Sequence, residues 1–502
     1  MIYLLLSVTW QESAESTPED TMDATLIVLR DTFLDICMLM KSPWQPWIAP
    51  GDEPAYQRLA AAIAEDLVNG KIAPGSRLPA QRDLSYRLGV GLGTVTKAYG
   101  LLARQGLASP FHGRGMFATN KILTTRKMVD LSLNVPPNVI SEQLLSGTLA
   151  SLATTIDADS FGASNFPKGT LDHRMAIAGW LQHYCTSADA ERMIFCNGGQ
   201  HALSTVLTAL VAPNICLGTD ELPFPGLVKI AHLLGIELVG IEADREGLLP
   251  DALGRIACEV ASRKKRLVLF TNPTAQNPTG KTMSRSRIKD LAAICKREDI
   301  LIIEDDVYAA FAARDRICFL DLAPERTYYI NSFAKLLTPG LRLGVLIAPS
   351  HQLDNLVRVL RAHGATDSPI SRLVIHKWIA DGVASHISKT ASAEAIVRNK
   401  LAASIFASMG DAWIGSGFHM FLSMGNSAAV ALANAARQRG IIVTDPAVSL
   451  SAGNDQSGIR LCLGGPTRDE LSGALKEIAA LHVQLGQATK ASAEDLEGNI
   501  NA

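Results

Sequence analysis

The sequence predicts a chain of two folding units: a small unit of three helices and a β-hairpin, followed by a large α/β unit. Three observations support this prediction. Apolar residues recur at helical spacing in the region before about residue 105. Farther along, strand-like apolar runs alternate with helical stretches. The length of 502 residues suits about three domains of ordinary size, or two of which one is large.

Composition and charge indicate a globular chain with one basic region. Apolar residues make up 47% and charged residues 19%, which excludes disorder for most of the chain. The net charge is −2, so the whole molecule carries no polycationic signal. Residues 54–120 nevertheless hold eight Lys or Arg and three acidic residues, a charge of +5, which leaves −7 for the rest.

Cysteine usage and apolar stretches point to the cytoplasm. The eight cysteines include no C-x-x-C pair, so we expect no zinc site or other metal site and no disulfide framework. The apolar start lacks Lys and Arg, which argues against a signal peptide. Two long stretches without charged residues, 193–219 and 412–436, are interrupted by Gly, Ser, Asn and His. We therefore expect no membrane span.

The small unit is expected over residues 54–119, after an extension (1–53) to which the pattern assigns no fold. Apolar spacing predicts a first helix over 56–67 and a second over 80–88. Thr94 can cap or open a third helix. Two short apolar runs then flank a glycine-rich reversal, which suits a hairpin. Two helices joined by a glycine turn, a basic third helix and a hairpin form the pattern of a winged helix-turn-helix, although another small helical domain fits the spacing equally well.

A linker is expected over 120–138, a large α/β unit over 139–485 and a polar, frayed tail over 486–502. Near-continuous apolar runs are typical of buried parallel strands. Four such strands are predicted at 267–271, 300–304, 327–331 and 344–348.

Chemistry-bearing residues follow these strands. Asn197-Gly198-Gly199-Gln200 comes after an apolar run and opens a helix, where free amides can hold a phosphate; the same turn can be purely structural. Asp305 and Tyr308 stand just past another strand, where open α/β sheets present ligands, although each could simply be a turn or cap residue. Lys335, in Ser332-Phe333-Ala334-Lys335, follows a third strand. A lone lysine would ordinarily be solvated.

Five motifs occur in the same order as in a known family, and together they indicate a resemblance that the spacing of apolar residues does not. The Gly-Gly-Gln turn, N-P-T-G, D-x-x-Y, S-x-x-K and P-G-x-R-x-G make the region from about Val129 to Leu485 resemble the fold-type I pyridoxal-phosphate aminotransferases, which have a smaller C-terminal α+β subdomain. Tyr56 to Ala118, with G-x-x-x-P-G-x-x-L-P and Gly113-Arg114-Gly115, resembles the GntR winged-helix family. In this order the two halves resemble the MocR branch of GntR regulators.

The resemblance assigns roles to individual residues. It implies that Lys335 is the Schiff-base lysine of pyridoxal 5'-phosphate and that Asp305 lies against the pyridine nitrogen. It also implies that Arg460 binds the carboxylate of an amino acid. Tyr308 and Asn277 would bond the ring hydroxyl, and Phe224 would stack on the ring. The phosphate would be held by Ser332, Arg342, Gly199 and Gln200.

For the small unit the resemblance implies DNA contacts by Arg82, Thr94, Thr96, Lys97 and Arg114. The sequence also departs from the family patterns. Ala334 replaces a frequent Ser, Phe166 stands where a Tyr commonly reaches the partner's phosphate, and Gly91-Leu92-Gly93 replaces the usual Ser-Arg before the third helix.

The resemblance therefore implies a cytoplasmic, homodimeric regulator that binds double-stranded DNA and senses an amino acid or amine through pyridoxal phosphate. The alternative is a working aminotransferase on which the winged helix is secondary. A third reading, a purely structural dimerisation domain without cofactor, conflicts with the intact Lys335, Asp305 and Arg342.

Overall fold

The computed structural model separates the chain into two compact units, residues 1–127 and 128–502. Only the backbone is described for Val68, Phe111 and residues 487–500. In the part of the chain that is described, no helix is both long and apolar enough to cross a membrane. The described residues are 48, 51, 53–68, 71–72, 75–104, 107–111, 115–119, 128–154, 156, 168–313, 315–364, 367–451 and 456–500.

The described part of the first unit contains three helices and a β-hairpin, as predicted. Its core is built from buried side chains at helical spacing, including Leu59 and Ile63 of the first helix and Tyr99 and Leu102 of the third. The third helix begins at Leu92, so the prediction that Thr94 opens it is wrong by two residues. The elements are α3 (Ala55–Val68), α4 (Gln81–Leu88), α5 (Leu92–Arg104), β1 (Ala108–Phe111) and β2 (Gly115–Ala118), with β1 and β2 antiparallel.

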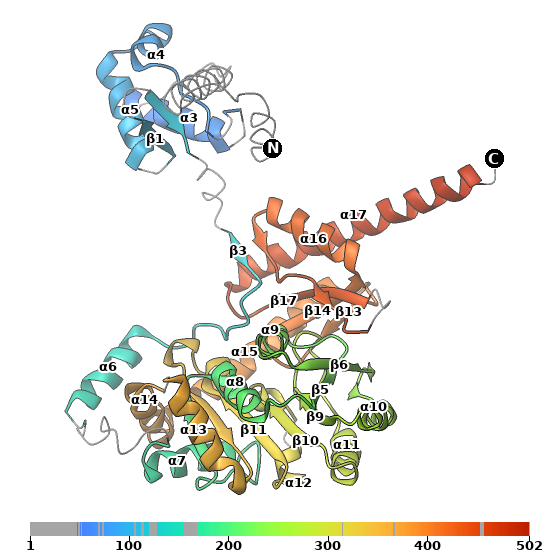
Figure 1. Ribbon diagram of the computed structural model, residues 1–502. Helices are drawn as coiled ribbons and strands as arrows, with labels where there is room; N and C mark the ends of the chain where they lie inside the picture. Colours follow the sequence, from blue (N-terminus) through green and yellow to red (C-terminus); the bar gives the residue numbers. More distant parts are fainter. Residues whose placement is uncertain are drawn as a thin grey trace, which may run out of the picture. The chain divides into compact units, whose positions relative to one another are not determined.

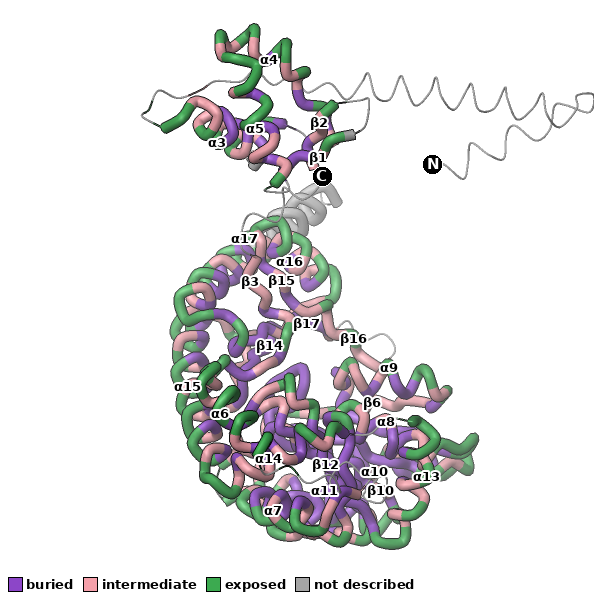
Figure 2. The backbone as a smooth tube through the Cα atoms, turned by 90° about the vertical axis from the view of Figure 1, so that its left-hand side faces the viewer, coloured by how far each residue is buried: buried purple, intermediate pink, exposed green. Residues whose placement is uncertain are grey.

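The second unit is built on a seven-stranded sheet of mostly buried strands (Figures 1 and 2). Four of its strands match the predicted ones closely. The strand predicted at 344–348 is not parallel, however: it pairs antiparallel with both neighbours. The strands, in spatial order, are β4 (Met193–Cys196), β12 (Gly344–Ile347), β11 (Thr327–Ser332), β10 (Leu301–Asp305), β9 (Arg266–Thr271), β5 (Ile215–Asp220) and β6 (Glu237–Ile241).

Helices cover this sheet (Figure 1). The apolar side chains of the sheet are buried in three clusters. One cluster joins the sheet to α6 (Glu142–Ala153), α7 (Leu171–Leu181), α14 (Pro369–Ala380) and α15 (Val383–Ile405). A second joins it to α8 (Gly199–Leu210), α9 (Pro225–Leu234) and α13 (Leu353–His363). The third involves α10 (Pro250–Ser262), α11 (Arg285–Arg297) and α12 (Phe319–Leu322), near the short hairpin β7 (Ala243–Asp244) and β8 (Gly247–Leu248).

A smaller subdomain follows α15. Its antiparallel sheet packs against α16 (Asn426–Gln438) and α17 (Arg468–Ile500). The polar residues after 486, expected to be a frayed tail, continue α17. The sheet order is β13 (Ala412–Ile414), β14 (His419–Gly425), β17 (Gln456–Cys462) and β16 (Ala447–Val448).

The predicted linker is too long at its C-terminal end. Residues 128–138 belong to the second unit, where β3 (Val129–Asp130) pairs in parallel with β15 (Ile441–Ile442). The segment was assigned to a linker because its periodicity is weak, yet its backbone is held by hydrogen bonds to distant parts of the chain. The amide of Leu131 donates to the carbonyl of Ile442 at 2.7 Å.

Candidate cofactor and ligand site

The ends of neighbouring strands bring the predicted site residues together. β10 ends at Asp305, and the next strand in the sheet, β11, ends at Ser332. A short 3₁₀ helix, Phe333–Lys335, follows β11 directly and carries the lysine. The site therefore lies at the carboxyl edge of the parallel strands, where open α/β sheets bind ligands.

The side-chain amine of Lys335 is held by a hydrogen bond and has a lowered pKa, as a nucleophilic amine requires. Its Nζ donates a 2.6 Å hydrogen bond to the main-chain carbonyl of Asn134. Burial and the nearby Arg460 lower the pKa of Lys335 to about 8, while Asp305 opposes this shift. A lysine of ordinary pKa is almost wholly protonated near neutral pH, so the lowered pKa increases the neutral, nucleophilic fraction.

Glu304, Asp305 and Asp306 are three consecutive acidic residues. Of these, Asp305 has a side-chain oxygen without a hydrogen-bond partner. Glu304 accepts two backbone hydrogen bonds from the start of α12, and Asp306 pairs with Arg316 at 2.7 Å. The Oδ1 of Asp305 is buried and has no hydrogen-bond partner. Burial raises the pKa of Asp305 to about 6. A buried acceptor without a partner is costly, so it marks a place where a cationic or N–H group is expected.

Glycines and an arginine line the start of α8. The N-cap Gly198 has φ 82°, and a Cβ there would lie 3.1 Å from Arg342 Nη2. Gly199 begins the helix, and a Cβ on it would lie 3.6 Å from the Cβ of Ser332. The guanidinium, the serine and the free helix amides thus converge, which suits a phosphate dianion. In this structure the Ser332 hydroxyl donates to the carbonyl of Leu343.

Gln200 and Phe224 also meet, at Gly226. The Nε2 of Gln200 donates to the Gly226 carbonyl at 3.2 Å. A Cβ on Gly226 would lie 2.5 Å from both the Gln200 Oε1 and the ring of Phe224. Phe224 is half-buried at the N-terminus of α9, so its ring is only partly covered by the protein.

Arg460 and Asn277 are in direct contact. The Nη1 of Arg460 donates to Asn277 Oδ1 at 2.7 Å, and its Nη2 donates to the carbonyl of Ser132 at 2.9 Å. The Nε of Arg460 is buried and unpartnered. Arg460 lines a cavity of about 340 Å³ together with Ser132, Arg437 and Thr444. A half-buried guanidinium that has an unpartnered N–H and lines a cavity of this size suits a carboxylate.

Sequence reasoning missed three residues of this site: Ser132, Asn134 and His419. The side chain of Asn134 is buried, and its Nδ2 donates to the hydroxyl of Tyr308 at 2.9 Å and lies 3.1 Å from Nδ1 of His419. His419 Nε2 lies 3.1 Å from the carbonyl of Gln276. No motif contains these residues. The N-P-T-G turn, which Gln276 precedes, was the nearest signal.

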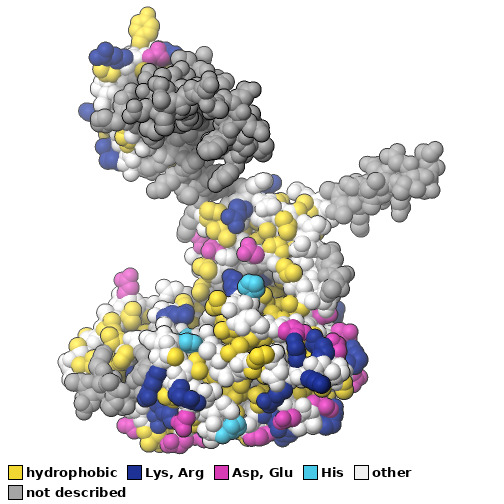
Figure 3. Space-filling model, viewed as in Figure 1, with side chains coloured by type: hydrophobic (Ala, Val, Ile, Leu, Met, Phe, Trp, Pro, Cys, Tyr) yellow, Lys and Arg dark blue, Asp and Glu magenta, His cyan; other side chains and the backbone are white. Residues whose placement is uncertain are grey.

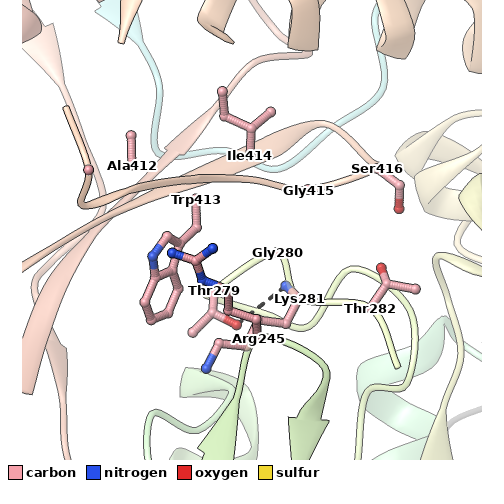
Figure 4. A pocket seen from close by; sticks show the side chains of 11 residues that line it. Arg245, Thr279, Gly280, Lys281, Thr282, Ala412, Trp413, Ile414, Gly415 and Ser416 are labelled. Atoms are coloured by element: carbon pink, nitrogen blue, oxygen red, sulfur yellow. Dashed lines mark hydrogen bonds between the residues drawn. The ribbon is translucent and has the colours of Figure 1, made fainter. Parts of the chain in front are cut away.

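A second cavity, of about 610 Å³, opens beside the N-P-T-G turn (Figure 4). Lys281 projects into it with its ammonium 4.5 Å from the ring centroid of Trp413. Burial lowers the pKa of Lys281, whereas Asp220, Asp244 and Glu221 oppose this shift. None of the predicted site residues lines this cavity.

Four of the five residues predicted to contact DNA are described, and each is at least partly exposed. Arg82, Thr96 and Lys97 are exposed and Thr94 is half-buried, whereas Val95 between them is fully buried. The Thr96 hydroxyl lies 2.8 Å from the Gln81 side chain, which joins α5 to α4. Figure 3 shows Lys and Arg side chains along the outer edge of this unit. Arg114 lies outside the described residues, as does Phe166 of the second unit.

Comparison with known proteins identifies both units. Residues 126–478 match the family model of aminotransferase class I and II. The chain belongs to the aminotransferase class I and II family. Residues 55–118 match the gntR family of bacterial regulatory proteins, whose helix-turn-helix is a DNA-binding module. The chain thus joins the two domains that define a GntR-type regulator of the MocR kind.

The most similar proteins include regulators and aminotransferases. The HTH-type transcriptional regulator YdeF of Bacillus subtilis is 26% identical over 71% of this chain and 78% of its own length. The pyridoxine biosynthesis transcriptional regulator PdxR of Corynebacterium glutamicum is 29% identical over 65% of this chain and 73% of its own. An archaeal alanine:glyoxylate aminotransferase has a similar fold, with a TM-score of 0.67 at 20% identity over 78% of this chain and 95% of its own.

Pyridoxal phosphate is the cofactor of this family, and the residues present fit it. The unpartnered Oδ1 of Asp305 suits a protonated pyridine nitrogen, and the cradle at Gly198 suits the phosphate. When bound, the cofactor supplies an electron sink for reactions at an amino-bearing carbon. Lys335 would supply the amine for covalent attachment, Asp305 would keep a proton on the ring nitrogen, and Arg460 would orient a carboxylate.

Proposed function

We propose that this protein is a transcriptional regulator that binds operator DNA through residues 54–119 and senses an amino acid or amine at the pyridoxal-phosphate site. One observation carries the proposal: a gntR-type domain is joined to a domain in which Asp305 and Lys335 lie at the ends of neighbouring strands, with Arg460 near the lysine. A domain that served only as a scaffold would not require a buried amine of lowered pKa beside an unpartnered carboxylate.

The ligand class follows from the side chains of the site. An amine can take the place of Lys335 on the cofactor, and a carboxylate can pair with Arg460 by two parallel N–H···O bonds. Amino acids carry both groups, so they are the favoured class over simple amines. Such a ligand alters DNA binding only through a difference in its affinity for two arrangements of the protein, for which about 1 to 3 kcal/mol is the usual scale.

A DNA-binding titration with the holoprotein tests this function. The protein's own upstream region is titrated at several concentrations of a panel of amino acids and amines, and cofactor absorption is recorded in parallel. We expect at least one amino acid to change both the absorption and the DNA affinity. Constant DNA affinity across ligands that visibly change the absorption would contradict the sensor function.

Transamination is the alternative function, because the chain retains Lys335, Asp305 and Arg460. An aromatic amino acid aminotransferase of Schizosaccharomyces pombe is 28% identical over 40% of this chain and 48% of its own length. Keto acid production over many turnovers would favour the enzyme. Conversion that stops after a single turnover would favour the sensor.

We also propose a homodimer formed through the second unit, since a regulator that reads two half-sites needs two DNA-binding domains. Large apolar side chains are exposed on three adjoining helices, α6, α7 and α14. Hydrophobic side chains over α6 are visible in Figure 3. An exposed cluster of this kind is typical of a subunit interface. The exposed side chains are Leu145, Leu149, Leu171, Met175 and Ile370.

A further inference from the structure

A chain of three hydrogen bonds ends at Tyr308, and each bond has only one possible direction. The chain starts at the main-chain carbonyl of Gln276, which can only accept. It lies 3.1 Å from His419 Nε2, so that nitrogen carries a hydrogen. Burial, together with Arg460, lowers the pKa of His419 to about 3, so the ring is neutral and its Nδ1 carries no hydrogen.

The neutral histidine determines which way the amide of Asn134 points. His419 Nδ1 can only accept, and it lies 3.1 Å from Asn134 Nδ2. One amide hydrogen therefore goes to His419, and the second goes to the hydroxyl oxygen of Tyr308 at 2.9 Å. A flipped amide would require a hydrogen on both ring nitrogens, and the low pKa of His419 excludes that form.

Tyr308 consequently accepts from Asn134 and must direct its own hydrogen elsewhere. We propose that Asn134 is a positioning residue that holds Tyr308 as a hydrogen-bond donor toward the ring oxygen of the cofactor. The inference rests on the proposed assignment of Tyr308 to the cofactor ring. A donor to that oxygen lowers its proton affinity, and so lowers the pH at which the nitrogen joining the cofactor to Lys335 loses its proton.

The charged and titratable groups around Tyr308 come from several elements. They are Arg460 and Cys462 of β17, Asp305 of β10 and His419 of β14. None of them is a described hydrogen-bond partner of the Tyr308 hydroxyl, whereas Asn134 is. Asn134 is thus the described side chain that sets the direction of this hydroxyl.

Two substitutions distinguish this role from simple packing. In Asn134→Asp, a carboxylate can only accept, so it would take the hydrogen of Tyr308 and remove the donor from the cofactor. In Asn134→Ala, Tyr308 stays free to donate. The readout is the pH at which the visible absorption of the bound cofactor changes. We expect Asn134→Asp to raise this pH by about one unit, and Asn134→Ala to raise it by less than half as much.

A Tyr308→Phe background separates hydrogen bonding from charge. Without the hydroxyl, the shift caused by Asn134→Asp should fall to less than half. An equal shift in both backgrounds would mean that the new charge acts alone, and would overturn the inference. So would equal shifts for Asp and Ala, or no shift for either.

Controls keep this test separate from that of the proposed function. Asn355→Asp, on α13, adds the same charge at an asparagine whose Nδ2 donates to the carbonyl of Ala209, and should leave the absorption unchanged. If a variant binds too little cofactor for a spectrum, cofactor titration into the apoprotein provides the same comparison of Asp with Ala. Failure of the unmodified protein to bind cofactor would refute the proposed function, and this inference with it.

Discussion

Lys335 donates a 2.6 Å hydrogen bond to the main-chain carbonyl of Asn134, a residue 201 positions earlier in the chain. The lysine comes from the end of a strand in the large sheet, and Asn134 comes from a segment next to the smaller subdomain. This contact fixes the amine without adding a carboxylate beside it. Burial can therefore keep the pKa of Lys335 low, which an ion pair would oppose.

Lys335 should be the point of covalent attachment of pyridoxal phosphate. Lys335→Ala should lose the visible absorption of the attached cofactor, because no other amine occupies this position. Borohydride reduction followed by peptide mapping should label Lys335 in the unmodified protein. Label on a different lysine would show that the assignment is wrong, and Lys281→Ala, in the neighbouring cavity, is a matched control that should keep the absorption.

Attachment of the cofactor to the apoprotein should depend on pH with a midpoint near 8. The pKa of Lys335 is lowered to about 8 from an unfolded value near 10.5, so the neutral amine forms at a pH about 2.5 units lower than in a free lysine. The rate should rise about tenfold per unit below pH 8 and level off above it. The same shift destabilises the folded apoprotein below pH 8, and this cost disappears as pH rises through 8 to 10.5. A rate midpoint near 10 in stopped-flow measurements would contradict burial as the cause.

Arg460 should distinguish amino acids from amines. Arg460→Ala should weaken the binding of amino acids by about tenfold or more, because a charge-assisted bidentate pair is lost. Amines without a carboxylate should bind as before. Arg460→Lys should rescue little, since an ammonium lacks the fork geometry. Spectrophotometric titration measures both classes, and an equal loss for both would show that Arg460 acts through the fold.

DNA binding should depend on salt through Arg82 and Lys97. Each lost phosphate contact should reduce the slope of log affinity against log salt by about one. Arg82→Ala and Lys97→Ala are therefore expected to bind more weakly and with smaller slopes in fluorescence anisotropy titrations. Arg297→Ala, on α11 of the second unit, is the control. Unchanged slopes in both first-unit variants would remove these residues from the interface.

The exposed apolar cluster should be needed for dimerisation. Leu149→Glu and Met175→Glu place a charge on side chains that are 44% and 58% exposed, so the fold of the monomer should tolerate them. Sedimentation at micromolar concentration should show a dimer for the unmodified protein and a shift toward monomer for these variants. Leu233→Glu alters a side chain that is 83% exposed on α9 and should remain dimeric. A monomeric unmodified protein would refute the dimer.

Helices and strands that follow from local sequence patterns could be predicted. Features that depend on contacts between residues far apart in the sequence could not. Periodicity located the helices of the first unit, and apolar runs located the strands that position Asp305 and Lys335. The antiparallel direction of β12 was missed because an apolar run carries no information on strand direction. Asn134 was missed because a polar residue in a weakly periodic segment resembles a linker residue until the partners of its side chain are known.

The segment that follows Lys127 therefore belongs to the binding site as well as to the connection between the units. A fragment beginning at residue 139, the boundary that the sequence suggests, would retain every motif of the aminotransferase family. It would lack the carbonyls to which Arg460 and Lys335 donate and the amide that orients Tyr308. Such a fragment should fold with a faulty cofactor site, whereas one beginning at Met128 should keep it intact. A displacement of residues 128–134 would therefore move the groups that contact Lys335, Arg460 and Tyr308.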